Sequence, residues 1–194
     1  MFYEVSPVVL KGEHVRLEPL SQDHAQGLFN RGQEVSDWEF LPRACFVDMP
    51  DTRQWIDAAL EAPNQLPFAI IETSKDKAVG STRFLNIRPD HRSLEIGWTW
   101  LGREWQGTAV NTEVKSLLLE HAFERLRYLR VEFKTDARNL RSQKALERIG
   151  ANWEGVLRNH MIVQGDFSRD SVFYSVIDRE WPDVKERLAS LRNR

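Results

Sequence analysis

The chain has 194 residues, of which 41% are hydrophobic and 29% are charged, and its formal net charge is −2. This length suits one hydrophobic core better than two, and the composition is typical of a globular protein. A near-neutral charge gives no sign of binding to nucleic acid or acidic membranes, and no apolar run approaches the ~20 residues that span a bilayer. We therefore expect one domain over residues 1–194, with no nucleic-acid and no membrane partner.

The cysteine count and the first residues bear on location. Residues 1–14 include acids and a proline and lack the layout of a signal peptide. Cys45 is the single cysteine, so an intrachain disulfide is excluded, and a reducing, cytoplasmic location is expected. The five histidines show no metal-ligand spacing with one another or with Cys45, so no metal site is predicted.

The first half of the chain predicts strands and helices in turn. Alternating residues predict a strand over 14–18, and Ser21 is a suitable cap for a short helix that ends at Phe29. Residues 32–50 look irregular. A helix is predicted from Asp51, with one apolar face made of Trp55, Ile56, Ala59 and Leu60.

Two strands are predicted next, over 68–71 and 78–87. A third ends at Trp100, because apolar and other residues alternate there and place Leu94, Ile96 and Trp98 on one face, opposite Glu95. After residue 109 the spacing becomes helical, with the apolar positions Val110, Val114, Leu117, Leu118, Phe123 and Leu126.

The turn between this strand and helix is the most informative segment. A small-residue turn of this kind directs free backbone N–H groups and the positive end of a helix dipole toward one point, where a phosphate fits. Gly107 and Ala109 leave the approach open because they carry little or no side chain. The turn therefore predicts a phosphate site.

The last third predicts a strand over 130–135 and then a helix over 140–149, with Asn139 as N-cap and Gly150 just past its end. Two strands follow over 153–163 and 171–177, joined by a turn at 164–166. A final helix has an apolar stripe of Trp181, Val184, Leu188 and Leu191, which we expect to pack on its own sheet rather than on a second subunit. Monomer and homodimer both stay open.

These elements in this order resemble the GNAT superfamily of acetyl-CoA-dependent N-acetyltransferases, and in particular the branch of ribosomal-protein alanine N-acetyltransferases. The family loop Gln/Arg-x-x-Gly-x-Gly/Ala is matched by residues 104–109 at both small positions, but Glu104 stands at the first. Asn139, Ser142 and Gly150 match the family's second element, and Leu94-Glu95-Ile96-Gly97-Trp98 is similar to the branch's strand before the loop. The resemblance implies an α/β (α+β) fold, a central mixed, mostly antiparallel twisted sheet of about seven strands flanked by helices.

The activity that the resemblance implies is direct acetyl transfer from acetyl-CoA to a primary amine, without a metal. The amine attacks the thioester, a tetrahedral intermediate forms with its oxyanion near residues 99–101, and coenzyme A leaves as a thiolate. Many members carry a tyrosine where Leu146 stands, which leaves Ser142 as the nearest candidate for the acid. The resemblance further implies cofactor contacts from Trp100, Leu101, Arg103, Trp105, Gln106, Gly107, Thr108, Ala109, Val110, Asn139, Ser142 and Lys144.

Glu95 is our candidate for the base that accepts the amine proton, the other interpretation being an ordinary salt-bridge partner on a strand. Glu39, His160 or ordered water would replace it as the base. The acceptor is a small molecule or a protein N-terminus, with contacts expected from residues 32–50 and 81–87. The alternative function is a non-catalytic acyl-CoA sensor or scaffold, which the missing tyrosine and Glu104 favour.

Overall fold

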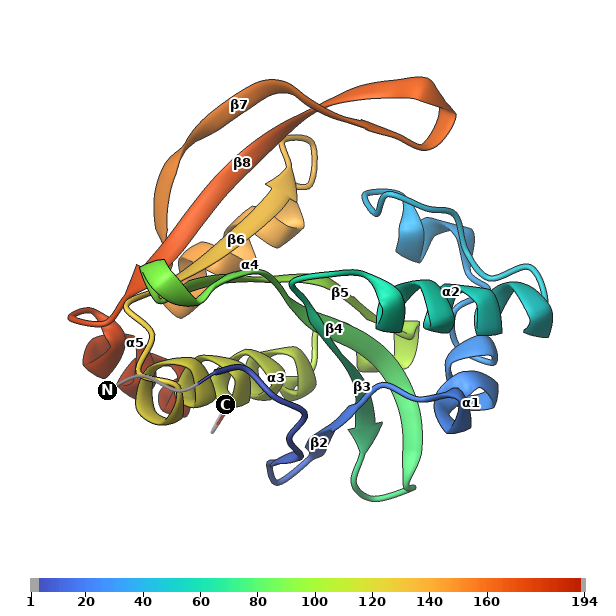
Figure 1. Ribbon diagram of the computed structural model, residues 1–194, viewed down its shortest axis with the longest axis horizontal. Helices are drawn as coiled ribbons and strands as arrows, with labels where there is room; N and C mark the ends of the chain where they lie inside the picture. Colours follow the sequence, from blue (N-terminus) through green and yellow to red (C-terminus); the bar gives the residue numbers. More distant parts are fainter. Residues whose placement is uncertain (1–3, 193–194) are drawn as a thin grey trace.

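The computed structural model describes residues 4–192 and has one mixed sheet at its centre (Figure 1). The sheet has eight strands in the order β1-β2-β3-β4-β5-β6-β8-β7, one more than the seven or so predicted. The strands are β1 (Leu10–Lys11), β2 (Val15–Pro19), β3 (Leu66–Glu72), β4 (Lys77–Arg88), β5 (Ser93–Leu101), β6 (Arg130–Asp136), β7 (Asn152–Val163) and β8 (Phe167–Ile177). The surplus strand, β1, is two residues long, too short for its side-chain alternation to be recognised in the sequence.

Among these strands only β5 and β6 pair in parallel, and every other neighbouring pair is antiparallel. Two parallel neighbours need a crossover connection, and here a helix between them supplies it. The mixed, mostly antiparallel sheet that the sequence predicted is therefore confirmed.

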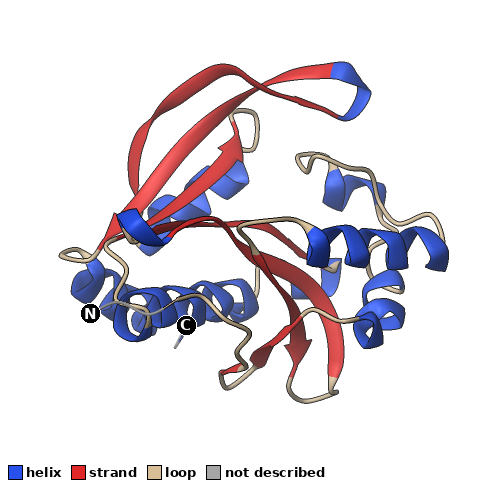
Figure 2. Cartoon of the chain, viewed as in Figure 1, coloured by secondary structure: helices blue, strands red, loops and turns tan. Residues whose placement is uncertain are grey.

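Helices cover both faces of the sheet (Figure 2). They are α1 (Ala25–Phe29), α2 (Met49–Glu61), α3 (Ala109–Glu120), α4 (Leu140–Ile149) and α5 (Trp181–Arg192), with a π-helical turn, η5 (His121–Arg125), extending α3. Short 3-10 turns are η1 (Gln22–His24), η2 (Val35–Trp38), η3 (Pro89–His91), η4 (Arg103–Trp105) and η6 (Gln164–Asp166). Buried side chains from α3, α4 and α5 form one hydrophobic cluster with the sheet, and those from α1 and α2 form another.

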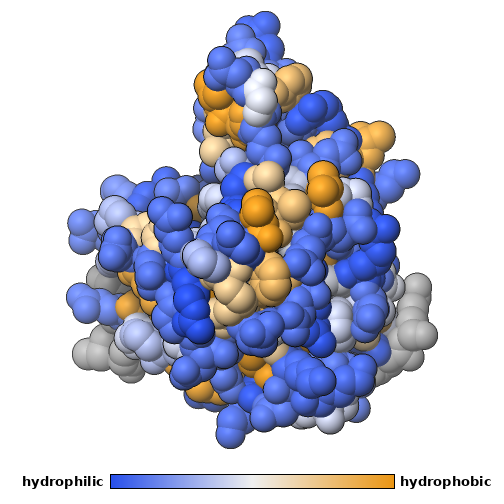
Figure 3. Space-filling model, turned by 90° about the vertical axis from the view of Figure 1, so that its right-hand side faces the viewer, coloured by the Kyte–Doolittle hydropathy of each residue, from blue (hydrophilic) through white to orange (hydrophobic). Residues whose placement is uncertain are grey.

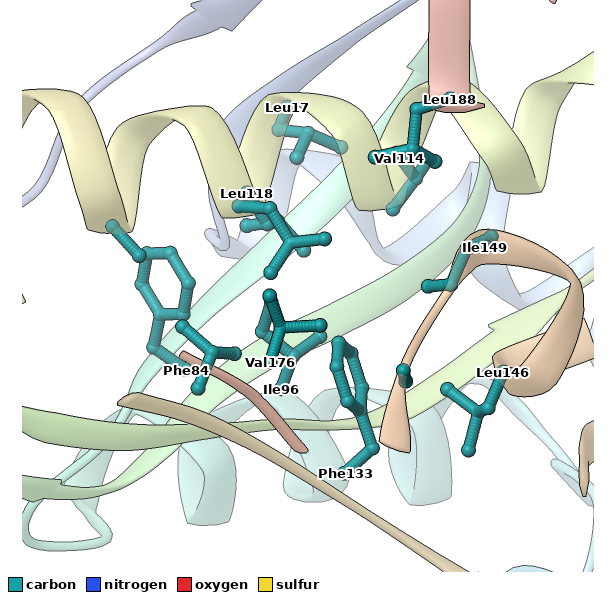
Figure 4. Packing of buried hydrophobic residues seen from close by; sticks show 14 of the residues in the cluster. Leu17, Phe84, Ile96, Val114, Leu118, Phe133, Leu146, Ile149, Val176 and Leu188 are labelled. Carbon is teal, nitrogen blue, oxygen red and sulfur yellow. The ribbon is translucent and has the colours of Figure 1, made fainter. Parts of the chain in front are cut away.

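The larger cluster fixes α3 against the strands that matter for the site. Leu94 and Ile96 of β5 are buried in one cluster with Val114 and Leu118 of α3. Figure 4 shows the side chains of Ile96, Val114 and Leu118 in this cluster. Burying side chains of this size stabilises the folded state by about 1.5–3 kcal/mol each. The N-terminal end of α3 is thereby held at a fixed distance from the end of β5.

Three local predictions concern helices. The last helix buries Trp181, Val184 and Leu188 against the chain's own core, as predicted. The second helix begins earlier than predicted, because Asp48 rather than a residue near Asp51 is its N-cap. Leu60 is 48% exposed, so its assignment to the apolar face was wrong. The buried face ends with Ala59, the residue directly before it in α2.

Candidate active site

The strands β5 and β6 separate in the middle of the molecule. Their register pairs only Ser93–Glu95 with Arg130–Glu132, yet β5 continues to Leu101 and β6 to Asp136. Beyond the last pair the two strands diverge (Figure 1). One edge of β5 past Glu95 therefore has backbone groups that no neighbouring strand pairs, and an extended ligand can bind there.

A bulge lies in β5 where it diverges. Gly97 pairs with Arg83 and Trp100 with Ser81, so two residues of β5 stand opposite Thr82 alone. Trp98 adopts φ 50, which is unusual for a bulky residue. The bulge turns the Trp98 ring toward Arg83, on the face that carries Glu95, so the prediction that Trp98 shares a face with Leu94 and Ile96 was wrong.

The turn before α3 is open and leads directly into the N-terminus of a helix. Gly107 has φ 73, and a Cβ added there would have no heavy atom within 4 Å, so the space in front of it is open. Thr108 is the N-cap of α3, its Oγ1 accepting from the Val110 N–H at 3.3 Å. Within residues 4–192 the N–H groups of Gly107 and Thr108 make no backbone hydrogen bond. The turn therefore combines free backbone donors with the positive end of a helix dipole.

The other predicted cofactor residues near this turn divide into two groups. Trp100, Leu101, Trp105 and Val110 are buried and pack in the core. Arg103 is exposed and contacts Ser36 and Asp37 of η2, while Gln106 donates to the Leu101 carbonyl and accepts from Arg141. The buried group shapes the turn, and Gln106 links it to α4.

The start of α4 also follows the prediction. The Asn139 side chain caps the helix by accepting from the Ser142 N–H at 2.9 Å, and Gly150 ends it with φ 96. Lys144 is exposed on the same helix. Leu146, at the position where the resembling family carries a tyrosine, is buried in the core and presents no polar group. Asn139 and the first turn of α4 follow the end of β6, the strand that diverges from β5.

Glu95 lines a cleft of about 360 Å³ on the sheet face away from α3. Its side chain is buried, accepts from Asn86 Nδ2 at 2.7 Å, and lies 3.5 Å from Lys134 Nζ. Asn86 reaches it because it adopts φ 48 within an irregular stretch of β4. The cleft is lined by Asn64, Asn86, Ile87, Arg88, Glu95, Glu132, Lys134, His160 and Phe173. A second cleft of about 410 Å³ lies by α1 and contains none of the predicted site residues.

His160 enters the same cleft from the β7–β8 hairpin. The register between these strands shifts between Leu157 and Met161, which places His160 in a bulge with its Nδ1 3.0 Å from Ser171 Oγ. Burial, and secondarily the positive charges of Lys134 and Arg169, lower the pKa of His160 below its usual value. The imidazole is therefore mostly neutral at neutral pH and is chemically able to accept a proton.

Lys115 of α3 lies beside the candidate site, and the sequence did not indicate it. It is buried under the diverging strands, where its Nζ donates to Thr99 Oγ1 at 3.0 Å and lies 5.5 Å from the centre of the Phe133 ring. Thr99 belongs to β5 and Phe133 to β6, so the ammonium lies between the two strands. Burial lowers the pKa of Lys115 to about 8. Only the cross-strand arrangement brings these residues together, and no local motif marks it.

The tip of the β7–β8 hairpin contacts the loop that follows η2. Gln164 Nε2 lies 2.5–2.9 Å from the carbonyl oxygens of Trp38, Leu41 and Arg43. In Figure 3 the hairpin projects above the body of the molecule and exposes apolar side chains. The loop over 38–43 falls within the irregular segment from which acceptor contacts were predicted.

A family model described as an acetyltransferase (GNAT) domain matches residues 14–152. The chain belongs to the GNAT acetyltransferase family. It is 35% identical over 100 residues to a putative ribosomal N-acetyltransferase, YdaF, from Bacillus subtilis, an alignment that covers 52% of this chain and about half, 54%, of that relative. These findings confirm the predicted family and the prediction of an acyltransferase.

Solved structures agree over nearly the whole chain. A GCN5-related N-acetyltransferase from Brucella melitensis superposes with a TM-score of 0.93 at 29% identity, covering 98% of this chain and 88% of that one. A putative acetyltransferase from T. thermophilus gives 0.90 at 38% identity, covering 97% and 99%. The strands that diverge and the turn before α3 thus belong to an acetyltransferase fold.

The described part of the chain has neither a metal-binding cluster nor a membrane-spanning helix. Over residues 4–192 no three or more His, Cys, Asp or Glu side chains are grouped to hold a metal ion. No helix in that range has the length and apolar character needed to cross a bilayer.

Proposed function

We propose that this acetyltransferase moves an acetyl group from acetyl-CoA to a primary amine by direct attack on the thioester. The observation that supports this most strongly is the pairing of two open features. The unpaired edge of β5 beyond Glu95 suits an extended pantetheine arm, and the free amides at Gly107 and Thr108 suit its pyrophosphate. A Cβ-free opening at Gly107 gives the phosphates room.

The residues of the chain then have separate tasks. Gly107, Thr108 and the dipole of α3 hold the anion, and Asn139 orients the arm from the start of α4. Backbone N–H groups of β5 around residues 99–101 stabilise the charge that develops on the carbonyl oxygen. Acetyl-CoA supplies an activated acyl group whose C–S bond breaks as the C–N bond forms.

The reaction requires two proton transfers. The attacking amine loses one, and Glu95 Oε accepts it, through a water where the two are not in contact. The departing sulfur gains one, for which Ser142 Oγ is the candidate that the family resemblance suggests. Lys115, buried between β5 and β6, adds a positive charge close to the place where the thioester is expected. Arg103, Trp105, Gln106 and Lys144 complete the proposed cofactor surface.

The test measures acetyl-CoA binding and coenzyme A release separately. Calorimetry with acetyl-CoA, ATP and NAD establishes which ligand is bound, and a thiol assay over a panel of amines establishes turnover. Binding of acetyl-CoA alone, followed by amine-dependent thiol release, is the expected result. Binding without release on any amine would support the alternative of a non-catalytic acyl-CoA sensor, and no acetyl-CoA binding would contradict both.

A further inference from the structure

A buried arginine of the central sheet lies beside the proposed acetyl-transfer site. Arg83 of β4 is 5% exposed, and its guanidinium carbon lies 4.6 Å from the centre of the Trp98 ring and 5.1 Å from that of Trp55. The two indoles belong to β5 and α2. Both rings are within cation–π distance of the guanidinium.

The positive charge of Arg83 has no salt-bridge partner among the described residues. Its Nη1 makes one long hydrogen bond, 3.3 Å, to Gln65 Oε1, and its Nε has no partner in the range 4–192. Burial lowers the pKa of Arg83 to about 10, which leaves it charged at neutral pH. Burying an unpaired charge is unfavourable, and contacts with two aromatic rings offset only part of that cost.

The position of Arg83 relative to Glu95 connects it to the site. Arg83 pairs with Gly97, and Leu85 pairs with Glu95, so Arg83 and Glu95 lie on one face of the sheet. Gly97 lies between them without a side chain, and a Cβ added there would be 3.1 Å from Glu95 Oε1. One strand step of two residues spans about 7 Å. A small molecule bound at Glu95 therefore has Arg83 about one such step away along β4.

We propose that Arg83 binds a carboxylate carried by the acceptor, so that the acceptor is an amine that also bears a carboxylate. This rests on the proposed function, because it identifies the substrate class of the same site. Both indole rings lie within cation–π distance of the guanidinium, and its planar fork of N–H groups can bind a carboxylate in a bidentate pair. The acceptor amine is then directed toward Glu95, and the negative charge that Arg83 lacks is supplied by the substrate.

The carboxylate has two possible sources, a free amino acid or the acidic side chain of a peptide's first residue. The experiment measures binding rather than turnover, by calorimetry in the presence of coenzyme A. In one arm N-acetylalanine is compared with N-acetylalanine amide. In the other, an N-acetyl-aspartyl dipeptide amide is compared with its asparaginyl counterpart. We expect the wild type to bind the acid of at least one pair about ten- to a hundredfold more tightly than the matched amide.

The variants assign this preference to Arg83. Arg83→Met keeps an unbranched stem between the indoles and should abolish the preference, while acetyl-CoA affinity stays at the wild-type value. Arg83→Lys keeps the charge without the planar fork and should retain a reduced preference. Arg53→Gln removes an exposed arginine of α2 that contacts Gln22, and should leave the preference intact.

Two results would overturn the proposal: equal binding of acid and amide by the wild type in both arms, or a full preference kept in Arg83→Met. If Arg83→Met does not fold, a full preference kept in Arg83→Lys contradicts bidentate binding in the same way. Failure of the proposed acetyl transfer gives a different result, since an Arg83-dependent preference for acids would persist while no amine releases coenzyme A.

Discussion

Lys115 Nζ donates a hydrogen bond to Thr99 Oγ1 at 3.0 Å. This contact connects α3 to the part of β5 that no longer pairs with β6. Thr99 Oγ1 is also 2.8 Å from Thr82 Oγ1, so a short polar chain crosses from α3 through β5 to β4. These three polar side chains lie within a mostly apolar layer, and burying the ammonium charge of Lys115 there is unfavourable. The effect of this burial on the free energy of unfolding can be measured.

Replacing Lys115 with methionine should change the pH dependence of stability. The pKa is lowered to about 8 in the folded protein and is near 10.4 when unfolded, so between these values the unfolded chain binds the extra proton. The unfolding free energy of the wild type should therefore rise relative to Lys115→Met, by about 2 kcal/mol between about pH 7 and about pH 9.5. Urea denaturation of both proteins measures this. Parallel pH profiles would show that Lys115 is not buried as a charge.

Local chemistry explains which parts of this arrangement were predictable from sequence. Gly107, Asn139 and Gly150 each meet a requirement of their own turn or helix end, namely an open approach, an N-cap and a positive φ. Such requirements are satisfied by neighbours in the chain, and the structure places these residues as the sequence indicated. Whether they hold coenzyme A stays a prediction.

The parts that could not be predicted depend on register between strands. At the bulge, Thr82 alone faces two residues of β5. The residue with a positive φ there is Trp98, and the sequence gives no sign of it because a glycine is absent at that position. The meeting of Lys115 with Thr99, and of Arg83 with Trp55 and Trp98, joins separate elements. A one-residue change of register would reverse the faces, so single-strand alternation does not determine them.

Gly107→Glu should weaken acetyl-CoA binding. The new carboxylate would stand against the pyrophosphate, and repulsion between like charges at close range corresponds to about a tenfold loss or more. Gly165→Glu is the matched control, because Gly165 has φ 67 and equally open surroundings at the hairpin tip. It carries the same backbone strain without the phosphate. Equal acetyl-CoA affinities for the two folded variants, measured by calorimetry, would remove the phosphate site from this turn.

Asn139→Asp separates the cap from cofactor positioning. An aspartate still accepts from the Ser142 N–H, so the unfolding free energy should change by less than about 0.5 kcal/mol. The lost amide donor and added negative charge should reduce acetyl-CoA affinity by about fivefold or more. Asn139→Ala is the comparison, since it loses the cap and about 1 kcal/mol of stability. If Asn139→Asp matches wild type in both stability and affinity, Asn139 is a helix cap and nothing more.

Glu95→Gln should lower turnover while leaving acetyl-CoA affinity nearly unchanged. Glutamine keeps the shape and an oxygen that accepts from Asn86 Nδ2, but it removes the basic oxygen that accepts the amine proton. General-base catalysis typically contributes about 10²- to 10⁴-fold, and the loss should fall in that range at neutral pH. It should shrink as pH rises, because more of the amine is then already neutral. Steady-state thiol release across pH, on an amine already shown to react, measures the effect.

Two companion variants make the Glu95 assignment decisive. Glu154→Gln removes a carboxylate of β7, the outer strand of the hairpin, that forms a salt bridge with Arg130 of β6. This variant should leave turnover close to wild type. His160→Gln removes a second candidate base of the cleft, an imidazole whose lowered pKa keeps it neutral. If Glu95 is the base, His160→Gln retains most of the activity and its pH profile. Wild-type turnover in Glu95→Gln together with a large, pH-dependent loss in His160→Gln would transfer the proton to the imidazole and refute the assignment of Glu95.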